Sequence, residues 1–251
     1  MPASSPTSRV ALVTGASKGL GKAIAIALGR AGYRVAVNYR SDESGAQQTV
    51  AAITGNGGTA RAFAADVTDP GAVRGLIAEV KQTWGPVEVL VNNATGPQPM
   101  KPVEEYTWQE YQDQLDFFVK APVLLAQATL ADMKAARWGR VIHIGSEVVN
   151  LGNANFSAYV AAKAAMLGLT RSWANEFGPW QITVNLVAPG WIPVERHADM
   201  APEHFSAYSA SVPLRRQGLP EDVAASVVYL AGDGANFVTG QCLSVNGGKT
   251  F

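Results

Sequence analysis

Short apolar runs alternate with longer segments of helical composition along most of the chain. The runs are typical of buried strands and cover residues 10–13, 33–38, 61–65, 87–92, 141–145, 182–187 and 242–245. The intervening segments predict helices at residues 23–28, 41–53, 70–84, 108–134, 156–177 and 221–231. Residues 190–214 follow neither pattern and predict an irregular, mobile segment. This alternation predicts an α/β fold, a doubly wound parallel sheet flanked by helices on both faces.

We expect one domain. The chain has 251 residues with 47% hydrophobic content, a length at which α/β folds often form a single unit. We assign residues 9–251 to that domain and residues 1–8, which are polar, to a poorly ordered tail. The tail lacks the apolar core of a signal peptide, and no apolar run is long enough to span a bilayer. A cytoplasmic protein without a membrane partner is therefore expected.

Charge and cysteine content narrow the function classes further. The 20 basic and 20 acidic residues balance and form no runs of like charge, so no nucleic-acid partner is expected. The single cysteine, Cys242, excludes an internal disulfide. No histidine, cysteine and acidic residues are spaced as metal ligands, so no metal is expected.

A glycine-rich turn follows the first predicted strand and opens the first helix. Gly15, Gly19 and Gly21 let the backbone approach a ligand closely, and the first turn of a helix offers free N–H groups and the positive end of the dipole. This favours the diphosphate of a dinucleotide. The spacing is neither GxGxxG nor that of an ATPase phosphate loop, which needs Ser or Thr where Ala23 stands. A tightly packed turn that binds nothing remains the alternative.

Residues after the second and third strands bear on the choice of cofactor, because ligands lie beyond the carboxyl ends of such strands. A free 2′-hydroxyl usually meets a carboxylate after the second strand, but this chain has Asn38 and Arg40 there, with Lys18 in the glycine turn. Two cations favour a 2′-phosphate, hence NADP(H), with NAD(H) possible. Arg40 could equally be a solvated surface charge. Asp66 could accept from the adenine amino group or, with Asp69, cap the next helix.

The residues that can perform chemistry are Ser146, Tyr159 and Lys163. Tyr159 and Lys163 are four apart in a predicted helix and so share a face. A neighbouring ammonium favours the phenolate and lowers the pKa of a tyrosine, which can then exchange a proton with a carbonyl or alcohol oxygen. Ser146, at the end of the fifth strand, can hold the same oxygen. Alone, a Tyr-x-x-x-Lys pair usually means a packed ring beside a solvated lysine.

The chain resembles the short-chain dehydrogenase/reductase family from residue 14 to residue 248, most nearly its 3-oxoacyl-acyl-carrier-protein reductase and glucose dehydrogenase branch. The matching pieces are residues 14–21 (Thr-Gly-Ala-Ser-Lys-Gly-Leu-Gly), Asp66-Val67, residues 92–94, Ser146, Tyr159, Lys163, Asn185, Pro189-Gly190 and residues 245–248. The resemblance implies a Rossmann-type fold and a homotetramer. It implies that Tyr159 is the acid/base, that Lys163 binds the nicotinamide ribose, and that Ser146 positions the substrate.

The positions after the strands and the resemblance together predict a cofactor site. It comprises Gly15, Ser17, Lys18, Gly19, Leu20, Gly21, Asn38, Arg40, Asp66, Val67, Asn93, Ala94, Tyr159, Lys163, Pro189, Gly190 and Ile192.

Three positions depart from the family pattern. Phe118 aligns with an asparagine whose role is to hold a water that links the lysine to solvent, and phenylalanine cannot bind that water. Either another group, such as Asp116, rebuilds the relay or proton transfer is slower. Thr95 replaces a glycine near the cofactor, and Val194 replaces the threonine that binds the carboxamide of the cofactor.

For the substrate, the sequence predicts a small oxygenated ketone, a sugar or an acyl thioester held by Ser146, Glu147, Asn153 and Trp191. His143 lies inside the fifth strand, and we expect a core or interface histidine. The predicted function is an NADP(H)-dependent oxidoreductase that interconverts a ketone and a secondary alcohol. An NAD(H)-linked sugar or polyol dehydrogenase, and a cofactor-binding regulatory or scaffold protein without turnover, stay open as alternatives. The intact Ser146, Tyr159 and Lys163 favour an enzyme.

Overall fold

Seven parallel strands form one sheet in the order β3-β2-β1-β4-β5-β6-β7. The computed structural model describes residues 9–195 and 201–251; the predicted tail at 1–8 and residues 196–200 of the predicted irregular segment lie outside the described residues. The strands are β1 (Val10–Val13), β2 (Arg34–Tyr39), β3 (Thr59–Ala64), β4 (Val87–Asn92), β5 (Gly139–Ile144), β6 (Ile182–Pro189) and β7 (Cys242–Val245). The predicted fold class is confirmed.

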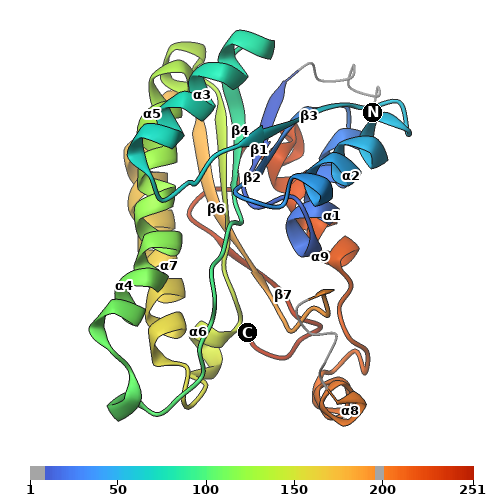
Figure 1. The fold of residues 1–251 in the computed structure, drawn as a ribbon, viewed down its shortest axis with the longest axis vertical. Helices are drawn as coiled ribbons and strands as arrows, with labels where there is room; N and C mark the ends of the chain where they lie inside the picture. Colours follow the sequence, from blue (N-terminus) through green and yellow to red (C-terminus); the bar gives the residue numbers. More distant parts are fainter. Residues whose placement is uncertain (1–8, 196–200) are drawn as a thin grey trace.

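Helices cover both faces of this sheet (Figure 1). One layer holds α1 (Gly19–Arg30), α2 (Glu43–Thr54) and α9 (Pro220–Ala231), and the other holds α3 (Pro70–Trp84), α5 (Ala121–Ala136) and α7 (Ser157–Phe177). Consecutive strand residues face opposite layers, so Val13 packs in one buried cluster and Leu12 in the other. Because both faces are covered, every residue of β1, β5 and β6 is buried, which explains their nearly continuous apolar runs.

The helix predicted over residues 108–134 is interrupted. Thr107 begins α4 (Trp108–Leu115) with a capping box to Glu110, and a π-helical turn, η2 (Asp116–Lys120), then leads into α5. The sequence pattern did not reveal this turn, because one extra residue per turn barely changes the hydrophobic periodicity.

The prediction of an irregular segment at 190–214 was wrong in part. Residues 202–211 form α8 (Pro202–Ser211), which starts at a proline, a residue that a first helical turn tolerates. A short helix, α6 (Val148–Leu151), was also missed. Both helices lie at the lower end of the molecule in Figure 1, near the ends of β5 and β6. Over the described ranges, no helix has the length and apolar character required to cross a bilayer.

Candidate active site

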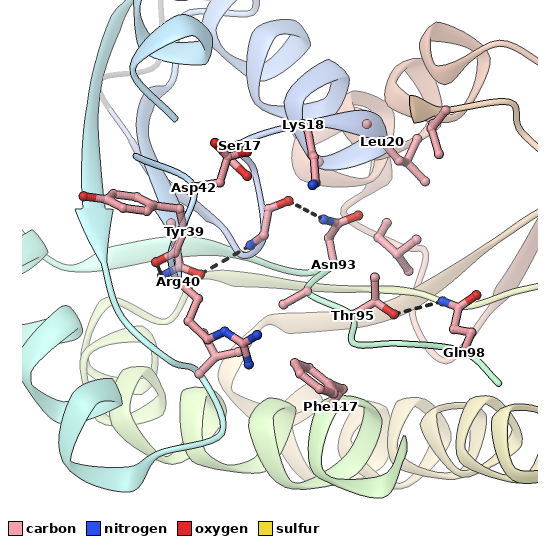
Figure 2. A pocket seen from close by; sticks show the side chains of 18 of the residues that line it. Ser17, Lys18, Leu20, Tyr39, Arg40, Asp42, Asn93, Thr95, Gln98 and Phe117 are labelled. Carbon is pink, nitrogen blue, oxygen red and sulfur yellow. Dashed lines mark hydrogen bonds between the residues drawn. The ribbon is translucent and has the colours of Figure 1, made fainter. Parts of the chain in front are cut away.

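A cavity of about 380 Å³ lies at the carboxyl ends of the strands (Figure 2). It is centred where β1 and β4 are neighbours in the sheet without being consecutive in the chain, the point at which strand order reverses. Every residue of the predicted cofactor site lines it except Gly190, and Ser146 lines it too. Loops that are far apart in the sequence therefore meet in a single cavity.

The glycine turn has no room for side chains. Gly15 and Gly19 have φ angles of +61° and +56°, and a Cβ on Gly15 would lie 2.9 Å from the Cα of Ala94. A Cβ on Gly21 would overlap the side-chain amide of Asn93 and the carbonyl oxygen of Gly15. Gly15 and Gly21 thus let the turn pack closely against the loop after β4, while the turn itself lines the cavity.

A carboxylate stands at the N-terminus of α1. The N–H of Gly19 donates to Oε1 of Glu195 at 3.2 Å, and the preceding Lys18 provides no side-chain cap. The oxygens of Glu195 stand in for the anion that unpaired N–H groups and the helix dipole stabilise. Figure 2 shows the amino group of Lys18 directed from this turn towards the cavity. The donor set at the turn therefore fits a diphosphate.

The side chain of Asn38 forms hydrogen bonds with backbone groups of the protein. It is buried in β2; its Oδ1 accepts from the N–H of Gly15 at 3.3 Å, and its Nδ2 donates to the carbonyl oxygens of Phe63 and Ala65. The side chain ties the glycine turn to β3. Asn38 lines the cavity, yet its polar atoms are engaged in these bonds within the protein.

The charges beyond β2 are more mixed than the sequence analysis assumed. Nη1 of Arg40 lies 3.7 Å from Oδ2 of Asp66, and both side chains are partly exposed. Asp42 also lines the cavity, so a carboxylate does follow β2. Its Oδ1 accepts from the N–H of Gly45 at 3.0 Å as the N-cap of α2, which directs it at the helix. The positive charges of Arg40 and Lys18 are thus partly offset.

Asp66 is an Asx-turn residue, and the helix cap is Asp69. Oδ1 of Asp66 accepts from the N–H and the hydroxyl of Thr68 at 2.9 and 2.7 Å. Burial raises the pKa of Asp66, but these bonds and Arg40 outweigh it and hold the pKa below its ordinary value. Asp69 accepts from the N–H of Ala72 at the start of α3.

Ser146, Tyr159 and Lys163 line the same cavity, as the spacing had suggested they could. Tyr159 and Lys163 project from α7, and Ser146 follows β5. Nζ of Lys163 donates to the carbonyl oxygen of Ile144 at 2.6 Å, which ties α7 to the end of β5. The ammonium lies 5.6 Å from the centroid of the Tyr159 ring. The pair is therefore held at the end of β5, beside the hydroxyl of Ser146.

The predicted substrate residues, other than Ser146, do not come together in the cavity. Among the described residues, Glu147, Asn153 and Trp191 are absent from its lining. Glu147 is 5% exposed, and its Oε1 accepts from the hydroxyl of Tyr208 at 2.8 Å. That hydroxyl also accepts from the N–H of Trp191 at 2.9 Å, and the Trp191 ring stacks on Phe205.

These contacts pin α8 against the loops after β5 and β6. A Cβ on Gly190 would overlap the Tyr208 hydroxyl, so this glycine makes space for α8, and its part in cofactor binding stays a prediction. Burial raises the pKa of Glu147, although the bond from Tyr208 opposes the shift. Glu147 and Trp191 thus hold α8 against the loops that follow β5 and β6. The sequence analysis missed Tyr208, because nothing in the local pattern marks a partner 61 residues away.

His143 is fully buried, as expected of a core histidine. Its Nδ1 lies 3.2 Å from Nδ2 of Asn92, and its ring lies against Trp173. Burial, aided by the charge of Lys163, lowers its pKa to about 3. The histidine is therefore neutral at physiological pH. Over the described ranges, no three His, Cys, Asp or Glu side chains are grouped as metal ligands would be.

The sequence of this chain matches a known family and its solved structures. The family model described as "Enoyl-(Acyl carrier protein) reductase" matches residues 15–250. The 3-oxoacyl-(acyl-carrier-protein) reductase FabG of Staphylococcus aureus is 39% identical over 240 residues, 95% of this chain and 96% of the relative. FabG of Pseudomonas aeruginosa is 38% identical over 96% of each chain. A variant of a short-chain dehydrogenase/reductase of Serratia marcescens superimposes with a TM-score of 0.90 at 32% identity, covering 98% of this chain and 99% of the other.

Proposed function

The chain belongs to the short-chain dehydrogenase/reductase family, and from that premise we propose that it reduces a 3-oxoacyl or other small ketone to a secondary alcohol with NADPH, or runs the reverse reaction. Membership makes it an NAD(P)-dependent oxidoreductase. The preference for NADP(H), the acid/base role of Tyr159 and the substrate are the proposed part.

The proposal rests on one observation: two groups of residues, one suited to a cofactor and one to the reaction, line the same cavity. The glycine turn with Lys18 and Arg40 lines one end, and Ser146, Tyr159 and Lys163 line the other. A nicotinamide cofactor supplies or accepts the hydride when bound. A nucleotide anchored by its diphosphate at α1 would extend towards Tyr159 along the ends of β1 and β4.

The protein side chains then handle the proton and the oxygen. The hydroxyl of Ser146 holds the substrate oxygen by a hydrogen bond. Tyr159 donates its phenolic proton to that oxygen in reduction and takes it back in oxidation. Lys163, fixed by its bond to the carbonyl oxygen of Ile144, favours the phenolate of Tyr159 through its charge. We further infer a homotetramer in the cytoplasm, as the resemblance implies.

The preference for NADP(H) is inferred from the positive charges of Lys18 and Arg40. The short distance between Asp66 and Arg40 argues against this preference. A 2′-phosphate would replace that carboxylate as the partner of the guanidinium, with a bidentate, charge-assisted contact. The second candidate, an NAD(H)-linked sugar or polyol dehydrogenase, is favoured if Asp42 or Asp66 instead accepts from a free ribose.

The test is cofactor binding and turnover measured together. NADPH and NADH are titrated by fluorescence, and ketones, sugars, 3-oxoacyl thioesters and enoyl thioesters are then added while absorbance is followed. The proposal expects tighter binding of NADPH and reduction of a ketone or 3-oxoacyl thioester. Tighter NADH binding contradicts the cofactor assignment. Reduction of enoyl thioesters alone contradicts the carbonyl chemistry and favours the activity named by the family model.

A further inference from the structure

The ring of Phe118 contacts both members of the Tyr159 and Lys163 pair. Nζ of Lys163 lies 3.8 Å from the centroid of the Phe118 ring, well within the range of a cation–π contact. The same ring meets that of Tyr159 edge to face, with centroids 5.4 Å apart and planes at 86°. One apolar side chain therefore touches the proposed acid/base and the lysine that tunes it.

The surroundings of this contact are apolar. Phe118 is 1% exposed and Lys163 is 4% exposed, and both lie beside a buried cluster that includes Met166 and Leu186. On Tyr159, the Phe156 ring stacks at 4.6 Å with planes at 17°. Burying an ammonium in such surroundings is unfavourable unless something compensates the charge. Attraction to an aromatic face grows as water is removed, so the Phe118 ring compensates the charge here together with the carbonyl oxygen of Ile144.

The π-helical turn sets the position of this ring. In η2 the N–H of Ala121 donates to the carbonyl oxygen of Asp116, five residues back, and Phe118 lies in the middle of the turn. Asp116 was the candidate to replace the asparagine in the water relay. Its Oδ2 instead lies 3.6 Å from Nζ of Lys120, and about half of its side-chain surface is exposed. Such turns commonly mark functional positions in helices. Here the turn coincides with a buried aromatic residue at the active site.

We propose that Phe118 is a positioning residue whose ring face holds the Lys163 ammonium charged and aligned beside Tyr159. The inference rests on the proposed function, because it assumes the acid/base role of Tyr159. It gives the phenylalanine a part in the reaction, where the sequence alone suggested only the loss of an asparagine.

The first test is Phe118→Leu, which removes the ring face but keeps an apolar side chain. Without the ring the buried ammonium is less favourable, so the phenolate of Tyr159 is harder to form. We expect kcat of alcohol oxidation at pH 7 to fall about 10-fold and the acid limb of its pH profile to move up by about one pH unit. Phe118→Tyr keeps the aromatic ring, so the acid limb of the pH profile should stay near its wild-type position.

The matched control is Phe63→Leu. Phe63 is also 1% exposed, packs edge to face on Trp84 and has the guanidinium of Arg61 5.2 Å from its ring centroid, but it lies in β3 away from Tyr159. Its replacement should lower the melting temperature and leave the pH profile unchanged. If Phe63→Leu and Phe118→Leu move the limb equally, or neither moves it, the proposal is overturned.

A double-variant cycle tests the route of the effect. In a Lys163→Met background, Phe118→Leu should change the residual kcat by less than about twofold, because the charge it acts on is gone. An undiminished effect contradicts the proposal.

Should Phe118→Leu fail to fold, the wild-type protein still gives a readout. A ring over the ammonium shifts the NMR signal of the Lys163 ε-methylene protons upfield, and a signal at its ordinary position overturns the contact.

The two proposals fail differently. If Tyr159→Phe keeps full turnover, Tyr159 is not the acid/base. The proposed role of Phe118, which depends on that assignment, is then also wrong. If Tyr159→Phe abolishes turnover while Phe118→Leu leaves kcat and the pH profile unaltered, only the role of Phe118 is wrong.

Discussion

The two ends of the cavity are built by different means. At the cofactor end, backbone groups of the glycine turn make the contacts: Nδ2 of Asn93 donates to the carbonyl oxygens of Thr14 and Gly15, and Asn38 accepts from the N–H of Gly15. At the substrate end, side chains outside the cavity lining hold the loops after β5 and β6, and the hydroxyl of Tyr208 joins Glu147 to the N–H of Trp191. A local sequence motif specifies the first end, and long-range packing specifies the second.

The largest expected effect on cofactor affinity comes from filling the glycine turn. In Gly21→Ala the new methyl group overlaps Asn93 and the Gly15 carbonyl, so the backbone must shift away from the diphosphate position. We expect NADPH affinity to fall about 100-fold, which corresponds to overpacking energies of a few kcal/mol. The control is Gly75→Ala on α3, where the methyl meets open space. Unchanged NADPH affinity in Gly21→Ala would remove the distinction between the two ends.

The next effect concerns only one phosphate group of the cofactor. Arg40→Ala should weaken NADPH binding about 10-fold or more through loss of a charge-assisted contact, and should alter NADH binding by less than about twofold. Arg61→Ala, whose side chain pairs with Glu79 on the surface, is the control and should change neither affinity. An equal loss for both cofactors would show that Arg40 acts on something other than the 2′-phosphate.

At the substrate end, Tyr208→Phe removes the hydroxyl that links two loops. The oxygen of Glu147 and the N–H of Trp191 then lose a partner, and the packing of α8 against the loops after β5 and β6 loosens. We expect KM for the ketone to rise about 5-fold while the dissociation constant of NADPH stays within about twofold. Tyr229→Phe, at a half-exposed position on α9, serves as the control. A fall in NADPH affinity would mean that the two ends are coupled.

The smallest effect on cofactor binding and turnover is expected in the sheet interior, which belongs to neither end. The pKa of His143 is lowered from 6.5 to about 3. Between these two pH values the unfolded chain binds a proton at His143 and the folded chain does not. Folding stability should therefore fall as the pH drops from 6.5 towards 3, by up to about 1.4 kcal/mol per pH unit. Urea unfolding at pH 7 and pH 5 should show a smaller loss for His143→Asn than for wild type. An equal loss in both proteins contradicts a neutral buried histidine.

The sequence predicted the sheet, most of the helices and the residues that line the cofactor end of the cavity, because these depend on local patterns. Glycines at fixed spacing set the shape of the turn, and apolar runs set the strands, so Gly15 to Gly21 appear in the cavity as expected. Asn38 lies inside β2, which extends through Tyr39 and buries the amide, so its part in cofactor binding stays a prediction. A carboxylate at Asp42 was overlooked because it is also a helix cap.

The substrate end could not be predicted in the same way. Glu147 and Trp191 are polar or aromatic residues beside Ser146 and Gly190, and their sequence neighbourhood suggested contact with substrate. Their actual partner, Tyr208, lies in a helix that the irregular composition of residues 190–214 concealed. Phe118 shows the same limit, because its contact with Lys163 depends on a π-helical turn that hydrophobic periodicity does not reveal.

The most direct measurement of the central claim uses Tyr159→Phe. NADPH binding to this variant is measured by fluorescence, and reduction of the best ketone is followed by absorbance in the same samples. The account predicts a dissociation constant within about threefold of wild type and a kcat lower by about 1,000-fold, because the proton donor at the substrate oxygen is gone. Turnover within about tenfold of wild type would contradict the assignment of Tyr159 as the acid/base.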